Sequence, residues 1–386
     1  MRIVQANAVY DPAVRTPAAL LDLYRTLSEW SVAVAAAGAD VSVVQRFSSA
    51  SQLERDGITY QFTHDSSPPW LSTKDAPVSF VDAIAARRPD VVHINGLIFP
   101  QLVSAIRTAV GPRTAIVAQH HGGEFPIRGS GLIGLWRRHR WRGGLAMADA
   151  ISFTAAEQAA PWRSAGVLGD QRIIEIIEAS TTIRTVTRDR ARGALGLSGD
   201  PLILWVGRLT TNKDPLTVLD GLEVALPQLP GARVVMVFGD DTLLDSVDAR
   251  VRASRVLSET VSLAGRVAHE EMPNYYGAAD LFISGSHSEG SGYALIEAMA
   301  SGVVPVVTDI PAFRMIAGPC GARWAAGNAA ELTRTLVAVA GGGHSHLESQ
   351  RRAVAERFER VLSWPALASQ TVREYAALAD AVRIAR

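Results

Sequence analysis

The sequence predicts an α/β protein built on two doubly wound parallel sheets, and two observations lead to this prediction. Short runs rich in β-branched residues alternate with helical patterns along the whole chain, which is typical of βαβ units. The length of 386 residues exceeds what one hydrophobic core usually serves. We therefore expect two α/β domains of ordinary size.

The expected strands fall into two sets. In the first half they lie at 2–7, 41–45, 58–62, 91–95, 114–121, 150–154 and 173–178. In the second half they lie at 202–207, 233–239, 261–265, 281–284 and 303–308. Turn formers and a run of Thr and Arg fill 180–200, so we place the domain boundary after residue 182. The domains are then 1–182 and 183–363, followed by a helix at 364–386.

The composition limits the classes of partner and the compartment. The formal net charge of zero argues against a dedicated nucleic-acid binder. A single cysteine, Cys320, allows neither an internal disulfide nor a cysteine-based zinc site. The N-terminus does not resemble a signal peptide, and no apolar run reaches the roughly 20 residues of a membrane span. We expect a cytoplasmic protein.

Two cations follow the expected strand 202–207. Arg208 and Lys213 lie just past its end, where ligands bind in open α/β sheets. Together they could neutralise a diphosphate, although a pair of solvated loop cations would look the same. The only other lysine in the chain is Lys74, while arginine is abundant. This rarity favours a functional role for Lys213.

A glycine-rich loop and a helix follow the expected strand 281–284. Gly290 and Gly292 allow a close approach of backbone to a ligand, and a helix is expected over 293–300. Glu289 lies in the loop and Glu297 about one turn into the helix, so both carboxylates could accept hydrogen bonds from sugar hydroxyls. Alternatively, one carboxylate interacts favourably with the dipole at the amino end of the helix, and the other is an ordinary surface residue.

The string SEGSGYALIEAMASGVVPVVTD at 288–309 resembles the donor-site signature of GT-B glycosyltransferases, in the retaining family 4, or glycosyl transferases group 1. VGRL with the following Lys-Asp resembles the phosphate loop of that family, and GRVAHEEMPNYYGAAD at 265–280 its segment beneath the nucleobase. The resemblance implies two Rossmann-like domains facing a central cleft. The first would hold the acceptor and the second the nucleotide sugar, with helix 364–386 packing back on the first.

The resemblance also implies roles for individual residues. Arg208 and Lys213 would bind the diphosphate, Glu297 the ribose and Glu289 the transferred sugar. The other implied donor contacts are Gly207, Arg266, Val267, Gly290, Ser291 and Gly292.

Two histidines end the expected strand 114–121. The resemblance places a histidine there near the reacting sugar, with His121 the better match and His120 the second. One of two adjacent strand-end histidines is expected to be packed in the interior. The first domain also departs from the family: residues 8–15 replace a double-glycine loop, and residues 179–181 replace a Pro-Asn-Gly turn.

The resemblance implies a retaining, metal-independent transfer from a UDP- or GDP-sugar, without a cofactor. Asp240 and Asp241 are interpreted as a turn cap. The alternatives are a nucleotide-sugar epimerase and a catalytically silent binding protein of the same fold. The acceptor, the sugar and the oligomeric state stay open.

One further segment, 131–144, interleaves aromatic and basic residues in an expected helix. We interpret it as a solvated basic face, with contact to anionic lipid or an acceptor phosphate as the alternative.

Overall fold

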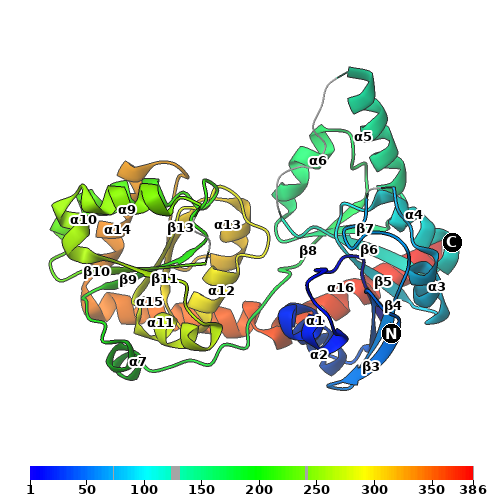
Figure 1. Ribbon diagram of the computed structural model, residues 1–386, viewed down its shortest axis with the longest axis horizontal. Coiled ribbons are helices and arrows are strands. Elements are labelled where there is room, and N and C mark those ends of the chain that lie inside the picture. Colours follow the sequence, from blue (N-terminus) through cyan, green and yellow to red (C-terminus); the bar gives the residue numbers. More distant parts are fainter. Residues whose placement is uncertain (73, 123–130, 240–241, 386) are drawn as a thin grey trace. The chain divides into compact units, whose positions relative to one another are not determined.

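The computed structural model describes residues 1–72, 74–122, 131–239 and 242–385. The chain divides into two compact units (Figure 1). The first comprises Met1–Ala179 together with Trp364–Arg386, and the second comprises Ser180–Ser363. Each unit contains one sheet covered by helices, so the predicted pair of α/β sheets is confirmed.

The sheet of the first unit has the order β3-β4-β2-β1-β5-β6-β7-β8. All neighbours pair in parallel except β3 and β4. The strand order reverses direction between β1 and β5, and at such a point the loops diverge and leave room for a ligand. The strands are β1 Arg2–Asn7, β2 Asp40–Arg46, β3 Ser51–Arg55, β4 Ile58–Thr63, β5 Val91–Asn95, β6 Ala115–Gln119, β7 Ala150–Phe153 and β8 Arg172–Glu175.

Strand β3 corrects the expectation of a purely parallel sheet, because it runs antiparallel to β4. The two strands are joined by Asp56 and Gly57, which have φ of 53° and 76°. Asp-Gly is favoured in such hairpin turns, since both residues tolerate positive φ. The strand was missed because it is polar and lies at the sheet edge, without an apolar run.

The helices of the first unit include the C-terminal segment of the chain. Helix α16 packs against α2, burying Trp364 and Tyr375 in the core of the unit. The indole of Trp364 donates a hydrogen bond to Glu29 at 3.0 Å. The helices are α1 Pro17–Leu23, α2 Arg25–Ala36, α3 Val78–Ala86, α4 Pro100–Val110, α5 Gly131–Leu145, α6 Ala160–Ser164 and α16 Trp364–Ala385.

Three of the four buried residues of helix α5 lie at its carboxyl end, and the fourth is Gly134. Gly144 packs so closely on α4 that a Cβ there would lie 2.3 Å from the carbonyl oxygen of Pro100. Trp141 is buried and its ring centroid lies 5.8 Å from that of Trp162. The amino-terminal half of the helix projects beyond the rest of its unit (Figure 1).

The sheet of the second unit is parallel, with the order β11-β10-β9-β12-β13-β14. Its strands are β9 Leu202–Gly207, β10 Arg233–Phe238, β11 Val261–Gly265, β12 Leu281–Ser284, β13 Val304–Thr308 and β14 Ala322–Trp324. Its helices are α7 Arg188–Leu195, α8 Pro215–Ala225, α9 Leu244–Arg252, α10 Arg255–Thr260, α11 Met272–Ala278, α12 Tyr293–Ala300, α13 Pro311–Ala317, α14 Ala329–Ala340 and α15 Gly343–Arg357. The chain reverses its winding between β9 and β12, which places a ligand-binding position beyond the ends of these two strands.

Helix α7 corrects the expectation of an irregular segment at 180–200. Two of its arginines, Arg188 and Arg192, pair with the buried carboxylate of Asp280 at 3.2 and 2.7 Å. Arg351 of α15 lies 3.6 Å from the same carboxylate. A buried charge is stabilised only when it is paired, so this cluster fixes the polar helix α7 to the unit. None of the described helices is long and apolar enough to cross a bilayer.

Candidate functional site

The carboxyl ends of β9 and β12 continue into two loops that are tied together by Asn212. Its side-chain amide donates to the carbonyl of Ser288 at 3.0 Å, and its amide oxygen accepts from the Ser288 N–H at 3.1 Å. The N–H of His287 donates to the backbone carbonyl of Asn212 at 2.8 Å. A Cβ at Gly285 would lie 3.1 Å from the carbonyl oxygen of Lys213, so this glycine permits the close approach.

Lys213 and Glu289 form an ion pair across these loops. The same carboxylate oxygen accepts a hydrogen bond from the hydroxyl of Ser286 at 2.7 Å. Thr308, at the end of β13, donates to the carbonyl of Ser286 at 2.6 Å and so fixes the loop from a third strand. The side chains of Lys213 and Glu289 are 19% and 13% exposed, so they form a largely buried pair at the predicted donor position.

Arg208 follows Gly207 at the end of β9 and is exposed. A Cβ at Gly207 would lie 3.0 Å from the ring of Trp205, so this strand end also needs glycine. In the described part of the chain, no carboxylate pairs with the guanidinium of Arg208. An exposed cation at the start of a loop that also carries Lys213 suits an anionic ligand.

Helix α12 is preceded by its N-cap residue Gly292, which has φ of 61° and lies against Ile316. Glu297, one turn into the helix, accepts a hydrogen bond from the hydroxyl of Tyr276 at 2.8 Å. Burial, reinforced by the carboxylate of Glu297, raises the pKa of Tyr276 well above its usual value. Tyr276 therefore stays protonated and holds Glu297 by donation. Sequence reasoning missed Tyr276, although it lies in the quoted segment 265–280.

The predicted nucleobase contacts lie after β11. Arg266 is exposed and its guanidinium donates to the carbonyl of Gly239 at the end of β10, whereas Val267 is half-buried. Gly290 and Ser291 lie in the partly buried loop before α12. The second unit thus brings the predicted donor residues to one edge of its sheet, and their contacts with a donor stay predictions.

His121 lies past the end of β6 and forms an ion pair with Glu178, its Nδ1 2.6 Å from a carboxylate oxygen. The carboxylate is buried, whereas the His121 side chain is 44% exposed. Burial disfavours the charged imidazole, but Glu178 outweighs this effect and raises the pKa of His121 above its ordinary value. Sequence reasoning missed Glu178 as a site residue, although a charge ending the apolar run 173–178 is a signal.

His120 is packed in the interior. Its ring lies between Phe153 and Trp162, with centroid distances of 5.0 and 5.8 Å, and its Nδ1 accepts from the N–H of Gly122 at 3.2 Å. Burial lowers the pKa of His120 to about 4. This histidine packs against aromatic rings as a neutral group, and its predicted donor contact stays a prediction.

The family comparison decides the class of the second unit. Residues 187–338, which contain the linked loops and most of their supporting strands, match the family model described as glycosyl transferases group 1.

The second unit carries a group 1 glycosyltransferase domain.

Two relatives of this glycosyltransferase domain are named as a mannosylfructose-phosphate synthase and a mannosyltransferase. Mannosylfructose-phosphate synthase of Agrobacterium fabrum is 38% identical over 133 residues, which are 33% of this chain and 29% of the relative. GDP-mannose:cellobiosyl-diphosphopolyprenol alpha-mannosyltransferase of Xanthomonas oryzae pv. oryzae is 27% identical over 63% of this chain and 61% of its own length. The matched parts thus span less than two thirds of these relatives.

Solved structures show the fold of the whole chain. Sucrose-phosphate synthase from Thermosynechococcus elongatus aligns with a TM-score of 0.70 at 20% identity, covering 98% of this chain and 99% of that one. Anabaena HepE in complex with UDP aligns with a TM-score of 0.70 at 15% identity, covering 98% and 100%. The glycosyltransferase domain therefore belongs to a chain with the predicted GT-B fold.

Possible metal ligands do not gather in the described residues: no group of three or more His, Cys, Asp or Glu side chains could hold an ion there. Asp240 and Asp241, interpreted from the sequence as a turn cap, lie outside the described residues.

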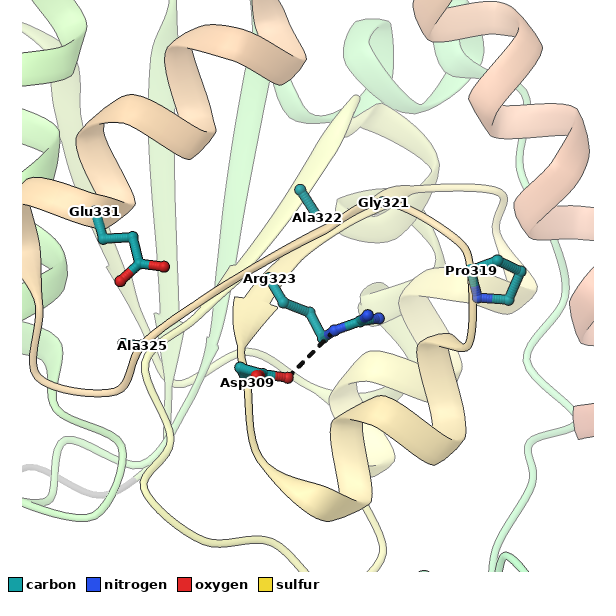
Figure 2. A pocket seen from close by; sticks show the side chains of 7 residues that line it. All are labelled: Asp309, Pro319, Gly321, Ala322, Arg323, Ala325 and Glu331. Carbon is teal, nitrogen blue, oxygen red and sulfur yellow. Dashed lines mark ion pairs between the residues drawn. The ribbon is translucent and has the colours of Figure 1, made fainter.

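A pocket of about 470 Å³ lies along β14 in the glycosyltransferase domain (Figure 2). Its Asp309 pairs with Arg323 at 3.3 Å and with Arg314 at 2.8 Å. None of the predicted site residues lines it; the lining residues are Asp309, Pro319, Gly321, Ala322, Arg323, Ala325 and Glu331. The Lys213–Glu289 loops, which carry the predicted donor residues, are therefore the better candidate site.

Proposed function

We propose that the protein is a retaining, metal-independent glycosyltransferase that uses a nucleotide-diphosphate sugar. The observation that carries this proposal is the pair of linked loops at the β9 and β12 ends, within the family-matched segment. They bring Lys213 and Glu289 together just before α12, and Arg208 begins the loop that carries Lys213. In this proposal the second unit binds the donor and the first unit binds the acceptor.

Lys213 is proposed to stabilise the departing diphosphate. Its ammonium has three N–H donors, so it can keep its hydrogen bond to Glu289 and still donate to phosphate oxygens. Arg208 adds a second cation and the amino end of α12 adds backbone N–H groups. Together they would supply the positive field that a metal ion supplies in other enzymes.

Glu289 and Glu297 are proposed to bind sugar hydroxyls. The hydroxyl of Ser286 donates a hydrogen bond to Glu289, and the hydroxyl of Tyr276 donates one to Glu297. These bonds preorganise both carboxylates before the donor binds. Retention would follow from departure and attack on the same face of the sugar, with an oxygen of the leaving diphosphate accepting the proton of the acceptor. The residues of the chain then contribute charge stabilisation and positioning.

The two lysines of the chain allow a direct test of the diphosphate assignment. A lysine-directed acylating reagent can modify Lys74 and Lys213, and mass spectrometry can follow each one. We expect saturating nucleotide diphosphate to protect Lys213 and to leave Lys74 reactive. Equal modification of Lys213 with and without nucleotide would contradict the assignment.

Turnover gives the second test. Lys213→Ala is expected to lower kcat by orders of magnitude with the fold intact, because it removes charge where the leaving group develops it. Lys74→Ala is the matched control and should keep normal turnover. Near-normal turnover of the Lys213 variant would refute the proposed role.

The nature of the reaction can be read from the products. Thermal-shift measurements with UDP and GDP identify the base, since a ligand that binds the native state raises its stability.

Incubation with donor alone should leave the sugar configuration unchanged, whereas an epimerase would isomerise it. NMR of the product should show the anomeric configuration of the donor, and a chelator should leave the rate unchanged.

A further inference from the structure

The amino-terminal half of α5 exposes a cluster of large apolar side chains. Four of them, here called the α5 tip, are exposed by 85% at Leu132, 69% at Ile133, 61% at Leu135 and 55% at Trp136. Positions 132, 135 and 136 share one face of a helix. Single exposed apolar residues are ordinary, but four within five residues mark an interaction surface.

Basic residues follow the tip directly. Arg137, Arg138, Arg140 and Arg142, here called the α5 collar, occupy the next two turns, and the helix contains no acidic residue. Arg137 and Arg142 are exposed, whereas Arg138 and Arg140 are half-buried. The guanidinium of Arg140 lies 5.7 Å from the ring centroid of Trp136. Within the described residues, no carboxylate forms an ion pair with the collar. The surface therefore combines apolar area with a concentrated positive charge.

The order of these groups along the axis fits a lipid surface. With a rise of about 1.5 Å per residue, the tip spans about 6 Å and the collar about the next 8 Å. Interfacial helices bury apolar side chains about 5–10 Å into the boundary between head groups and acyl chains. Tryptophan favours this boundary and arginine pairs with lipid phosphate.

We propose that the α5 tip inserts into the interface of an anionic lipid bilayer while the α5 collar binds its phosphate groups. Trp141 and Gly144 anchor the carboxyl end of the helix in the first unit, so the exposed tip extends from a packed base. The proposal uses neither the donor site nor any residue of the second unit, so it stands apart from the proposed transfer reaction. It develops the alternative that the sequence left open for 131–144, contact with anionic lipid, and the interpretation as a solvated face stays the competing hypothesis.

The test is cosedimentation of the full chain with vesicles. With 70% phosphatidylcholine and 30% phosphatidylglycerol we expect binding, and with phosphatidylcholine alone binding should be at least about tenfold weaker, since the two exposed cations, Arg137 and Arg142, are each attracted by the anionic surface by about 1 kcal/mol. The double variant Leu135→Ser/Trp136→Ser should lower binding to the anionic vesicles at least about tenfold. Because both side chains are exposed, its thermal stability should stay unchanged.

Matched controls use exposed apolar residues elsewhere. Val224→Ser on α8 and Ile384→Ser on α16 remove side chains that are 58% and 88% exposed, and should bind vesicles normally. A nucleotide thermal shift equal to that of the unmodified protein would show that the variants keep a working donor unit. If the unmodified protein shows no nucleotide thermal shift, this result contradicts the proposed transferase function and leaves the lipid proposal unchanged.

Fluorescence quenching by brominated lipid gives the depth of insertion. Quenching should be seen in the unmodified protein and should largely disappear in Trp136→Phe, although Trp70 is also exposed. Three results would overturn the proposal: no binding to anionic vesicles, unchanged binding by the tip variant, or full quenching in Trp136→Phe. A tip that binds only an acidic protein would show no binding to anionic vesicles, and this result would also overturn the lipid proposal.

Discussion

Replacing Glu178 by glutamine tests whether this buried carboxylate sets the protonation of His121. An amide of nearly the same shape can still accept a hydrogen bond from Nδ1, but it carries no charge. At the observed 2.6 Å, Coulomb's law gives about 1.6 kcal/mol at the dielectric constant of water and about 6 kcal/mol at an effective value near 20. Since His121 is 44% exposed, solvent screening favours a net value near 1–2 kcal/mol.

The sign of the pH dependence follows from the raised pKa of His121. A group whose pKa is higher in the folded state stabilises the fold fully below its unfolded pKa, about 6.5 for histidine, and loses this effect as pH rises through the folded pKa. Glu178→Gln should therefore lower the unfolding free energy of the first unit by about 1–2 kcal/mol at pH 5.5, and the loss should vanish by pH 9.

The assay combines urea unfolding at both pH values with NMR titration of ¹⁵N-labelled histidines. The pKa of His121 should fall in the variant. Glu175→Gln is the matched control, because Glu175 ends β8 on the same segment but accepts a hydrogen bond from the N–H of Ala156. If His121 titrates alike in the variant and the parent, the ion pair does not control its charge and the reasoning fails.

Three further substitutions probe the second unit. Tyr276→Phe removes the hydrogen bond to Glu297 and should weaken nucleotide-diphosphate binding about fivefold to tenfold, as measured by calorimetry; unchanged affinity would exclude a supporting role. Gly292→Ala should destabilise the unit by about 1–3 kcal/mol in thermal unfolding because φ is 61° and the new Cβ would lie 2.5 Å from a neighbouring side chain, whereas Gly193→Ala, in open helical space, should be neutral or slightly stabilising. Asp280→Asn leaves its arginines without their buried charge partner and should cost about 3–5 kcal/mol in denaturant unfolding, and a loss below 1 kcal/mol would contradict the importance of this cluster.

Helices and strands that are marked by a local pattern of apolar and turn-forming residues were predictable from the sequence. The bounds of α12, Tyr293–Ala300, agree with the prediction because a glycine-rich loop precedes the apolar helix and Gly302 follows it. The strands β9 and β12 were predicted from apolar runs that end at turn formers. These signals also place Arg208, Lys213 and Glu289 at strand ends.

Elements stabilised by distant partners were not predictable. Strand β14 has only three residues, and α7 is a polar helix fixed by arginines that reach Asp280 far along the chain. The pairing of His121 with Glu178 is of the same kind, because no spacing rule links a residue after β6 with one after β8. Local patterns predicted where chemistry could occur, and tertiary contacts decided which groups act together.

Helix α16 gives the chain an order of folding during synthesis. Trp364 and Tyr375 belong to the core of the first unit, yet the ribosome makes them only after the whole second unit. At about 5–20 residues per second, the first unit must wait roughly 10–40 s with the surface of α2 uncovered. A chain that stops before Trp364 would leave this surface permanently exposed, so premature termination should produce a chaperone client in which the second unit is already complete.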